Sequence, residues 1–124
     1  MLKLIPGLAA NVVGIEAVGK VEAADYQQVL DPAADQAVRD HDRVRLLYVL
    51  AGDYEGYTPA AMWEDAKLGS RHLKAWERIA VVTDHEGLSD AVRAFGWFMP
   101  CEVRTYPVSQ LEEAKAWIDE DASH

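Results

Sequence analysis

The sequence has few residues of the kinds that mark several large protein classes. Cys101 is the single cysteine in 124 residues, so no internal disulfide can form and a disulfide-stapled secreted scaffold is excluded. Basic residues number 12 against 21 acidic ones, a net charge of −9. That balance argues against a general nucleic-acid binder and against an anionic membrane surface as partner. No apolar run approaches the ~20 residues of a membrane span.

What is present indicates one folded domain. Half of the residues are hydrophobic and 27% are charged, as in an ordinary soluble globular protein. Neither a repeat nor a linker interrupts the chain, so we expect a single domain over 1–124. The apolar run at Leu2–Ile5 is too short for a signal peptide. We therefore expect a cytoplasmic protein.

The periodicity of the apolar residues predicts an α/β fold. Strand-like stretches, two of them forming an N-terminal β-hairpin, cover 2–5, 11–18, 44–50, 79–83 and 102–106. Helical patterns occupy 25–40, a segment starting at Thr58, 88–99 and 109–118, with a capping box at Ser109 and Glu112. Pro32 should kink or divide the first helix, and 51–57 is expected to be a loop. Strands that alternate with helices predict mostly parallel pairing in a mixed sheet.

Motifs along most of the chain resemble the SpoIIAA-like family of small bacterial proteins. They are Pro6-Gly7-Leu8, Asn11–Ile15, Gly19–Val21, Glu55–Thr58, Trp63–Lys67, Glu77–Val82 and Phe95–Pro100. The resemblance implies a STAS-like domain, more distantly similar to CRAL-TRIO domains. Because the family's members are largely of unassigned function, any activity has to be argued from a site.

Thr58 is a candidate phosphorylation switch. STAS proteins that resemble anti-sigma-factor antagonists carry a phosphorylatable hydroxyl at the start of the helix after the central strand, and Thr58 has about that position. A phosphate there would be stabilised by the helix N-terminus and would block a partner. The antagonists' own Asp-Ser-Ser/Thr-Gly motif is absent, and Thr58 followed by Pro59 is also the pattern of an ordinary helix cap.

Two neighbouring groups of side chains form a candidate surface for a ligand or partner. Aromatic rings occur at Tyr54, Tyr57 and Trp63, after the carboxyl end of a strand, where open α/β sheets bind ligands. A basic stretch follows, and it includes Lys67, Arg71 and His72. Its side chains fit a phosphate or an acidic partner. Alternatively, Trp63 belongs to the core and the charges are a solvated helix face.

Other candidates indicate no catalytic, metal or cofactor site. Asp84, His85 and Glu86 are adjacent, so their side chains point apart, and Asp84 is expected to cap the following helix. Cys101 has no neighbouring base in the sequence and is expected to pack. Trp97, Phe98 and Trp117 are core or dimer-surface residues, and an isologous homodimer is the expected form of self-association.

The sequence favours a non-catalytic STAS-like module that binds a protein partner or a small ligand in a regulatory role, with no cofactor. No phosphate-binding glycine loop, nucleophile elbow, zinc spacing or dinucleotide fingerprint occurs in it. Two alternatives remain open. One is a CRAL-TRIO-like carrier of a small apolar or lipid-like ligand, and the other is a small enzyme whose residues are assembled only by the fold.

Overall fold

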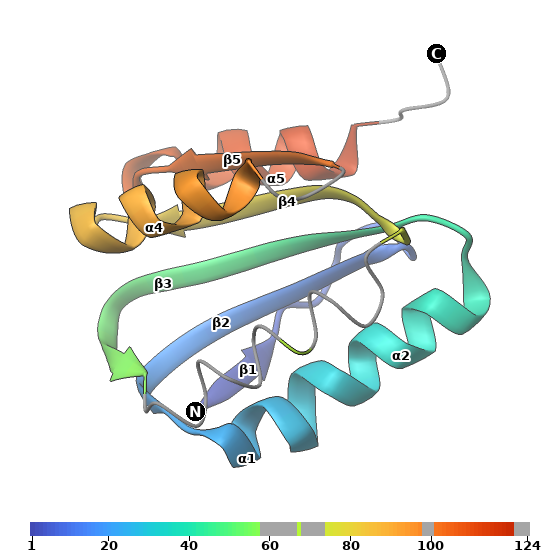
Figure 1. Ribbon diagram of the computed structural model, residues 1–124, viewed down its shortest axis with the longest axis horizontal. Coiled ribbons are helices and arrows are strands. Elements are labelled where there is room, and N and C mark those ends of the chain that lie inside the picture. The colour runs from blue at the N-terminus through green and yellow to red at the C-terminus, as the bar shows by residue number, and fades with distance from the viewer. Residues whose placement is uncertain (58–66, 68–73, 98–100, 121–124) are drawn as a thin grey trace.

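The computed structural model describes residues 1–57, 67, 74–97 and 101–120, and for 51–57, 88, 91 and 95 it describes the backbone alone. Lys67 is helical, and none of the helices in these ranges is long and apolar enough to span a membrane. The elements in chain order (Figure 1) are β1 (Leu2–Leu4), β2 (Val12–Val21), α1 (Ala23–Asp25), the π-helical turn η1 (Tyr26–Leu30), α2 (Asp31–Asp40), β3 (Val44–Tyr57), β4 (Trp76–Thr83), α4 (Glu86–Gly96), β5 (Glu102–Tyr106), the 3₁₀ turn η2 (Val108–Gln110) and α5 (Leu111–Asp119).

The strands form one five-stranded mixed sheet in the order β1-β2-β3-β4-β5. β1 runs antiparallel to β2, with Leu2 opposite Ala17, whereas β2 to β5 are parallel to their neighbours. Gly7, in the connection between β1 and β2, has a positive φ of 84°, a conformation that glycine adopts without steric cost. The predicted α/β class, with an N-terminal hairpin and parallel strands after it, is confirmed.

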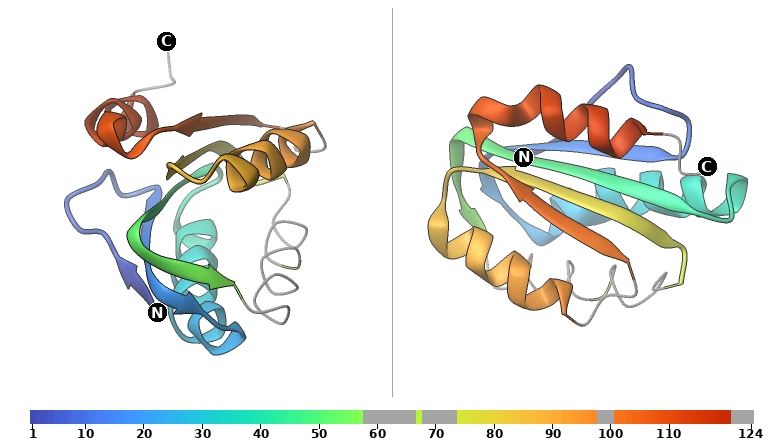
Figure 2. Two further views of the ribbon diagram at one scale, coloured as in Figure 1. Left: turned by 90° about the vertical axis from the view of Figure 1, so that its left-hand side faces the viewer. Right: turned by 90° about the horizontal axis from the view of Figure 1, so that it is seen from above.

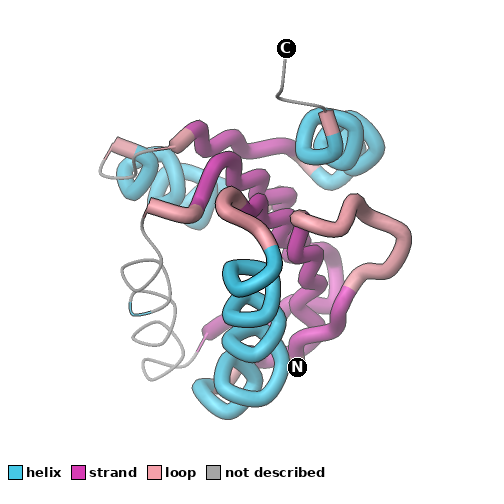
Figure 3. Tube along the Cα trace, turned by 90° about the vertical axis from the view of Figure 1, so that its right-hand side faces the viewer, coloured by secondary structure: helices cyan, strands magenta, loops and turns pink. Residues whose placement is uncertain are grey.

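Helices cover both faces of the sheet (Figures 2 and 3). One core lies between the sheet and η1, α2 and α4, and the other lies between the sheet and α5. β3 supplies alternate side chains to the two cores: Leu46, Tyr48 and Leu50 to the first, Leu47 and Val49 to the second. Burial on both sides explains why this strand is an almost unbroken apolar run.

The predicted loop at 51–57 is wrong, because β3 continues as a strand to Tyr57. β2 also continues past its predicted end and supplies the pairing partner, with Gly19 opposite Tyr54 and Val21 opposite Tyr57. The pairing is irregular on both sides of Gly19, which has a positive φ of 64°. Irregular pairing of this kind tolerates glycine and aspartate within a strand. Because these residue types are typical of loops, the composition of 51–57 predicts a loop where the structure has a strand.

The helical segment after β2 runs on through Pro32, and it changes from π-helical to α-helical at Asp31. The backbone N–H of Asp31 donates to the carbonyl of Tyr26, five residues back, so the turn before Pro32 is π-helical. Pro32 has no N–H with which to continue the regular ladder, and π turns are one way in which helices absorb such a fault. The turn buries Tyr26, whose hydroxyl lies 3.2 Å from that of Tyr48.

Candidate functional site

Most of the surface predicted around the helix that starts at Thr58 lies outside the described residues. This is the case for Thr58, Trp63, Arg71 and His72, and so for the phosphorylation switch. Lys67 is helical and exposed, and the backbones of Tyr54 and Tyr57 belong to β3. The aromatic and basic surface therefore stays a prediction.

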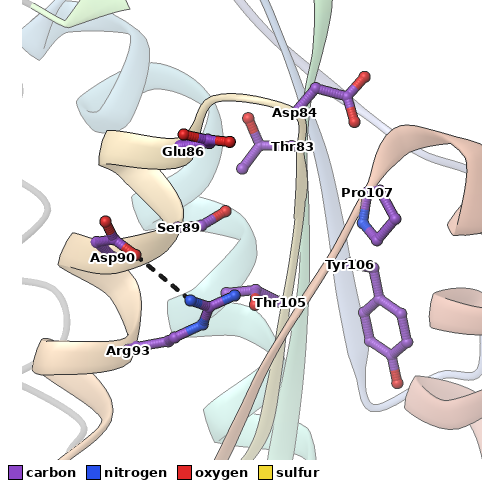
Figure 4. Close-up of a pocket in the computed structure, with 9 residues that line it drawn as sticks. All are labelled: Thr83, Asp84, Glu86, Ser89, Asp90, Arg93, Thr105, Tyr106 and Pro107. Atoms are coloured by element: carbon purple, nitrogen blue, oxygen red, sulfur yellow. Dashed lines mark hydrogen bonds and ion pairs between the residues drawn. The ribbon is translucent and has the colours of Figure 1, made fainter.

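Within the described part of the chain, a pocket of about 360 Å³ opens at the carboxyl ends of β4 and β5, beside the first turns of α4 (Figure 4). The carboxyl edge of parallel strands is where open α/β sheets bind their ligands. Polar side chains predominate among the lining residues, which are Thr83, Asp84, Glu86, Ser89, Asp90, Arg93, Thr105, Tyr106 and Pro107. The site thus suits a polar ligand, because an apolar one would leave buried polar groups without partners.

Thr83 and Asp84, at the end of β4, line the pocket and accept hydrogen bonds from nearby backbone. Thr83 is buried, and its Oγ1 accepts a hydrogen bond of 3.2 Å from the backbone N–H of His85. The Asp84 carboxylate accepts the backbone N–H of Val108, at 3.0 Å, and so joins the end of β4 to η2. The interpretation of Asp84 as the cap of α4 did not anticipate this contact.

The bond from Val108 also bears on how α5 begins. Ser109 lies inside η2, and no side chain caps the N-terminus of α5. The predicted capping box of Ser109 and Glu112 is therefore wrong. The chain enters α5 through the 3₁₀ turn η2, whose first N–H, that of Val108, donates to the Asp84 carboxylate. The N-cap position of α5 is Gln110, so Ser109 lies outside it.

One face of α4 forms the side wall of the pocket. Glu86, Ser89, Asp90 and Arg93 recur three or four residues apart, so they lie along one stripe of the helix. Arg93 Nη1 lies 3.4 Å from Asp90 Oδ1. Because both side chains are exposed, this ion pair contributes little to stability.

The charge of the lining residues is unbalanced. Three of the lining residues carry carboxylates, Asp84, Glu86 and Asp90, and a single one carries a guanidinium, Arg93. Arg93 is paired with Asp90, while no ion pair found in the described ranges involves Glu86. The pocket consequently favours a cationic group over an anion.

Neither a metal site nor an activated thiol is found among the described residues. They contain no group of three or more His, Cys, Asp or Glu side chains placed to hold a metal ion. Cys101 is half-buried and packs against the first core, as predicted. Burial, and secondly the carboxylate of Glu102, raise the pKa of its thiol. A raised pKa keeps the thiol protonated at neutral pH, which is the unreactive form.

The tryptophans singled out in the sequence have different environments. Trp117 is buried in the second core, where the guanidiniums of Arg78 and Arg104 lie 5.1 Å and 4.5 Å from its ring centroid. Trp97, in contrast, is 89% exposed at the end of α4. Phe98 lies outside the described residues.

Comparison with known proteins identifies the family. The model of the SpoIIAA-like family matches residues 12–119. The chain belongs to the SpoIIAA-like family. A solved structure, that of an uncharacterised protein of the DUF3478 family with a SpoIIAA-like fold from Shewanella loihica PV-4, superposes with a TM-score of 0.77. The two sequences are 25% identical over 94% of this chain and 93% of the other. No curated protein matches the sequence.

Most of the pocket residues in this SpoIIAA-like chain were missed by sequence reasoning. The sequence pattern indicates Asp84 and Glu86 only as metal ligands or helix-end residues, and no motif in it marks Ser89, Arg93 or Thr105. One signal was available. Residues at and just beyond the carboxyl ends of neighbouring parallel strands meet at one edge of the sheet, and 83–86 and 105–107 are such residues.

Proposed function

We propose that this SpoIIAA-like chain is a non-catalytic binding module that recognises a basic group of a protein partner or small ligand at the pocket of β4, β5 and α4. The observation that carries the proposal is the unbalanced charge of that pocket, three carboxylates to one guanidinium. The net charge of −9 acts in the same direction, because it attracts cationic partners over a distance. A regulatory role accords with such recognition without chemistry.

The polarity of the pocket favours this function over the carrier of a lipid-like molecule. An apolar ligand in contact with Thr83, Ser89 and Asp90 would take polar groups out of water without giving them partners. A lysine or arginine side chain, or a small amine, would instead donate hydrogen bonds to the carboxylates. The proposal concerns this pocket, and Thr58 as a switch stays a separate prediction.

Amide chemical shifts test the proposal directly. The probes are N-acetyl-lysinamide and N-acetyl-argininamide, with N-acetyl-glutamate amide as the acidic reference. We expect the two basic probes to move amide signals of 83–90 and 105–107 in a saturable way, and we expect the acidic probe to move none of them. No shift at these residues with either basic probe overturns the proposal.

A charge-matched pair of variants makes the test specific. The double variant Glu86→Gln, Asp90→Asn removes two carboxylates from the pocket and should weaken binding about tenfold or more, since charge-assisted hydrogen bonds to carboxylates contribute ~1.5–3 kcal/mol each. The control Glu112→Gln, Glu113→Gln removes two charges from the first turn of α5, away from the pocket. If both double variants weaken binding equally, the effect is one of net charge and the site is wrong.

A further inference from the structure

β5 forms an edge of the sheet whose outer side carries no described strand. It is last in the strand order and pairs with β4 alone. The right-hand view of Figure 2 looks onto this edge, where β5 lies between α5 and α4 and is covered by neither. Along such an edge, backbone N–H and C=O groups are available to another strand.

The central residues of β5 are self-complementary in charge. Glu102 and Arg104 lie two residues apart, so both side chains are on the α5 face of the sheet, and Val103 between them faces α4. Their side chains are 60% and 51% exposed, and Arg104 Nη2 lies 3.4 Å from Glu102 Oε2. In a second strand that runs antiparallel, the order of the acid and the base around Val103 is reversed, so each can lie opposite the other.

We propose that β5 pairs antiparallel with β5 of a second copy of this chain, with Val103 opposite Val103 of the second copy. A two-fold axis through this pair places Glu102 opposite Arg104 of the second copy, and Arg104 opposite Glu102 of the second copy. The two intrachain pairs then join in a ring of four charges of alternating sign. The interface is isologous, the commonest symmetry among homodimers.

The charges select this register over its neighbours. A two-fold axis perpendicular to the sheet passes between two copies of the same residue. The possible registers therefore differ only in which residue of β5 lies opposite its own counterpart. With Arg104 on the axis, two arginines face each other, and with Glu102 on the axis, two glutamates do. Like charges directly opposite destabilise an antiparallel pair, while opposite charges contribute ~0.2–1 kcal/mol. Only the register centred on Val103 places opposite charges face to face.

An exposed aromatic ring lies beside the same edge. A Cβ atom at Gly96 would be 3.3 Å from Cβ of Val103, so the end of α4 packs directly against the centre of β5. Trp97 is the next residue and is 89% exposed. Large aromatic side chains are enriched in protein interfaces, and a second copy on β5 would bring apolar surface to this tryptophan.

Charge reversal tests the register, with dimerisation of the untagged chain measured by sedimentation or light scattering over a concentration series. We expect a concentration-dependent dimer for the wild type. Glu102→Arg and Arg104→Glu each create two like-charge pairs and should each raise the dimer dissociation constant about tenfold or more. The double swap Glu102→Arg, Arg104→Glu restores opposite pairs and should recover most of the affinity. Glu113→Arg, on α5, is the control for net charge.

Each outcome decides the proposal. A wild type that stays monomeric up to about 1 mM, single reversals without effect, or a double swap that remains monomeric overturns it. Folding of each variant is checked by circular dichroism. Hydrogen exchange on the wild type keeps the test independent of variants, because dilution should speed exchange of amides in β5 and leave those in β2 unchanged. Binding at the pocket of α4 is a separate measurement, so failure of either proposal leaves the other intact.

Discussion

Arg45 and Arg78 lie opposite each other on β3 and β4, and both guanidiniums donate hydrogen bonds to backbone carbonyls at the C-terminal end of α5. Arg45 Nη1 donates to the carbonyls of Ile118, at 2.8 Å, and Glu120, and Arg78 Nη1 donates to that of Trp117 at 2.9 Å. The last carbonyls of a helix lack the N–H four residues further on that would pair with them in the helix interior, and they carry the negative end of its dipole. Two arginines on the sheet therefore donate hydrogen bonds to the terminal carbonyls of a helix that is remote in sequence.

An irregularity in β4 adds a counter-ion to this arrangement. Val44 lies opposite Trp76, but Arg45 lies opposite Arg78, so Glu77 is an extra residue between them. Its carboxylate accepts a hydrogen bond of 3.1 Å from Arg45 Nε. Since Arg45 is 5% exposed, its charge needs these partners to be tolerated in the interior.

We predict that Arg45→Met lowers the free energy of unfolding by about 2–4 kcal/mol, because it leaves two helix-end carbonyls and a carboxylate without their donor. Arg78→Met removes one carbonyl contact, the contact with the Trp117 ring and a 3.8 Å ion pair with the largely exposed Glu120, and should cost about 1–2 kcal/mol. The control Arg93→Met changes an exposed arginine and should stay within about 0.5 kcal/mol. Urea unfolding measures all three. Equal stability of the Arg45 and Arg93 variants would show that α5 does not depend on this contact.

Arg45 also shows where prediction from sequence reached its limit. Alternation and apolar runs predicted the hairpin and the strands at 44–50, 79–83 and 102–106, which lie within β3, β4 and β5, because those features follow from local backbone chemistry. A charged residue inside a buried strand indicates a partner, but its partners are residues 77, 118 and 120. Contacts over such separations in sequence depend on the packing of the whole fold.

The pocket shows the same limit at the candidate site. Asp84 could be located after a strand from the sequence, but its bond to Val108 joins two elements that are 24 residues apart. Arg93 and Thr105 share the pocket because α4 crosses back over the sheet to β5. Where β5 itself ends was predictable, since Pro107 follows it directly.

The bond from Asp84 to Val108 should control local opening of η2. We predict that Asp84→Ala removes the acceptor of the Val108 N–H, costs about 1 kcal/mol of stability and speeds hydrogen exchange at that amide several-fold. Asp90→Ala, on the other wall of the pocket, removes the same charge without touching Val108 and serves as the control. Exchange is followed amide by amide with NMR. If Val108 exchanges at the same rate in both variants, the carboxylate does not hold η2.

Cys101 should react slowly with alkylating agents, and Glu102 should be part of the reason. Burial and the Glu102 carboxylate both disfavour the thiolate and so raise the pKa of the thiol. Glu102→Gln removes the electrostatic contribution while burial persists, so the pKa falls part of the way and the iodoacetamide rate at pH 8 rises. The rate is measured against pH at low micromolar protein, with Glu113→Gln as the control. Unchanged profiles for Glu102→Gln would remove Glu102 as a cause.

The raised pKa also predicts how stability depends on pH. Because the unfolded chain ionises this thiol at a lower pH than the folded chain does, the favourable contribution of Cys101 is fully present below the unfolded pKa of ~8.5 and is lost as the pH rises through the folded pKa. Cys101→Ser, whose hydroxyl does not titrate in this range, should abolish that part of the decline. Urea unfolding of both proteins at pH 7, 8, 9 and 10 measures it. Parallel stability curves for the two proteins would mean that the thiol is equally ionisable in the folded and unfolded chains.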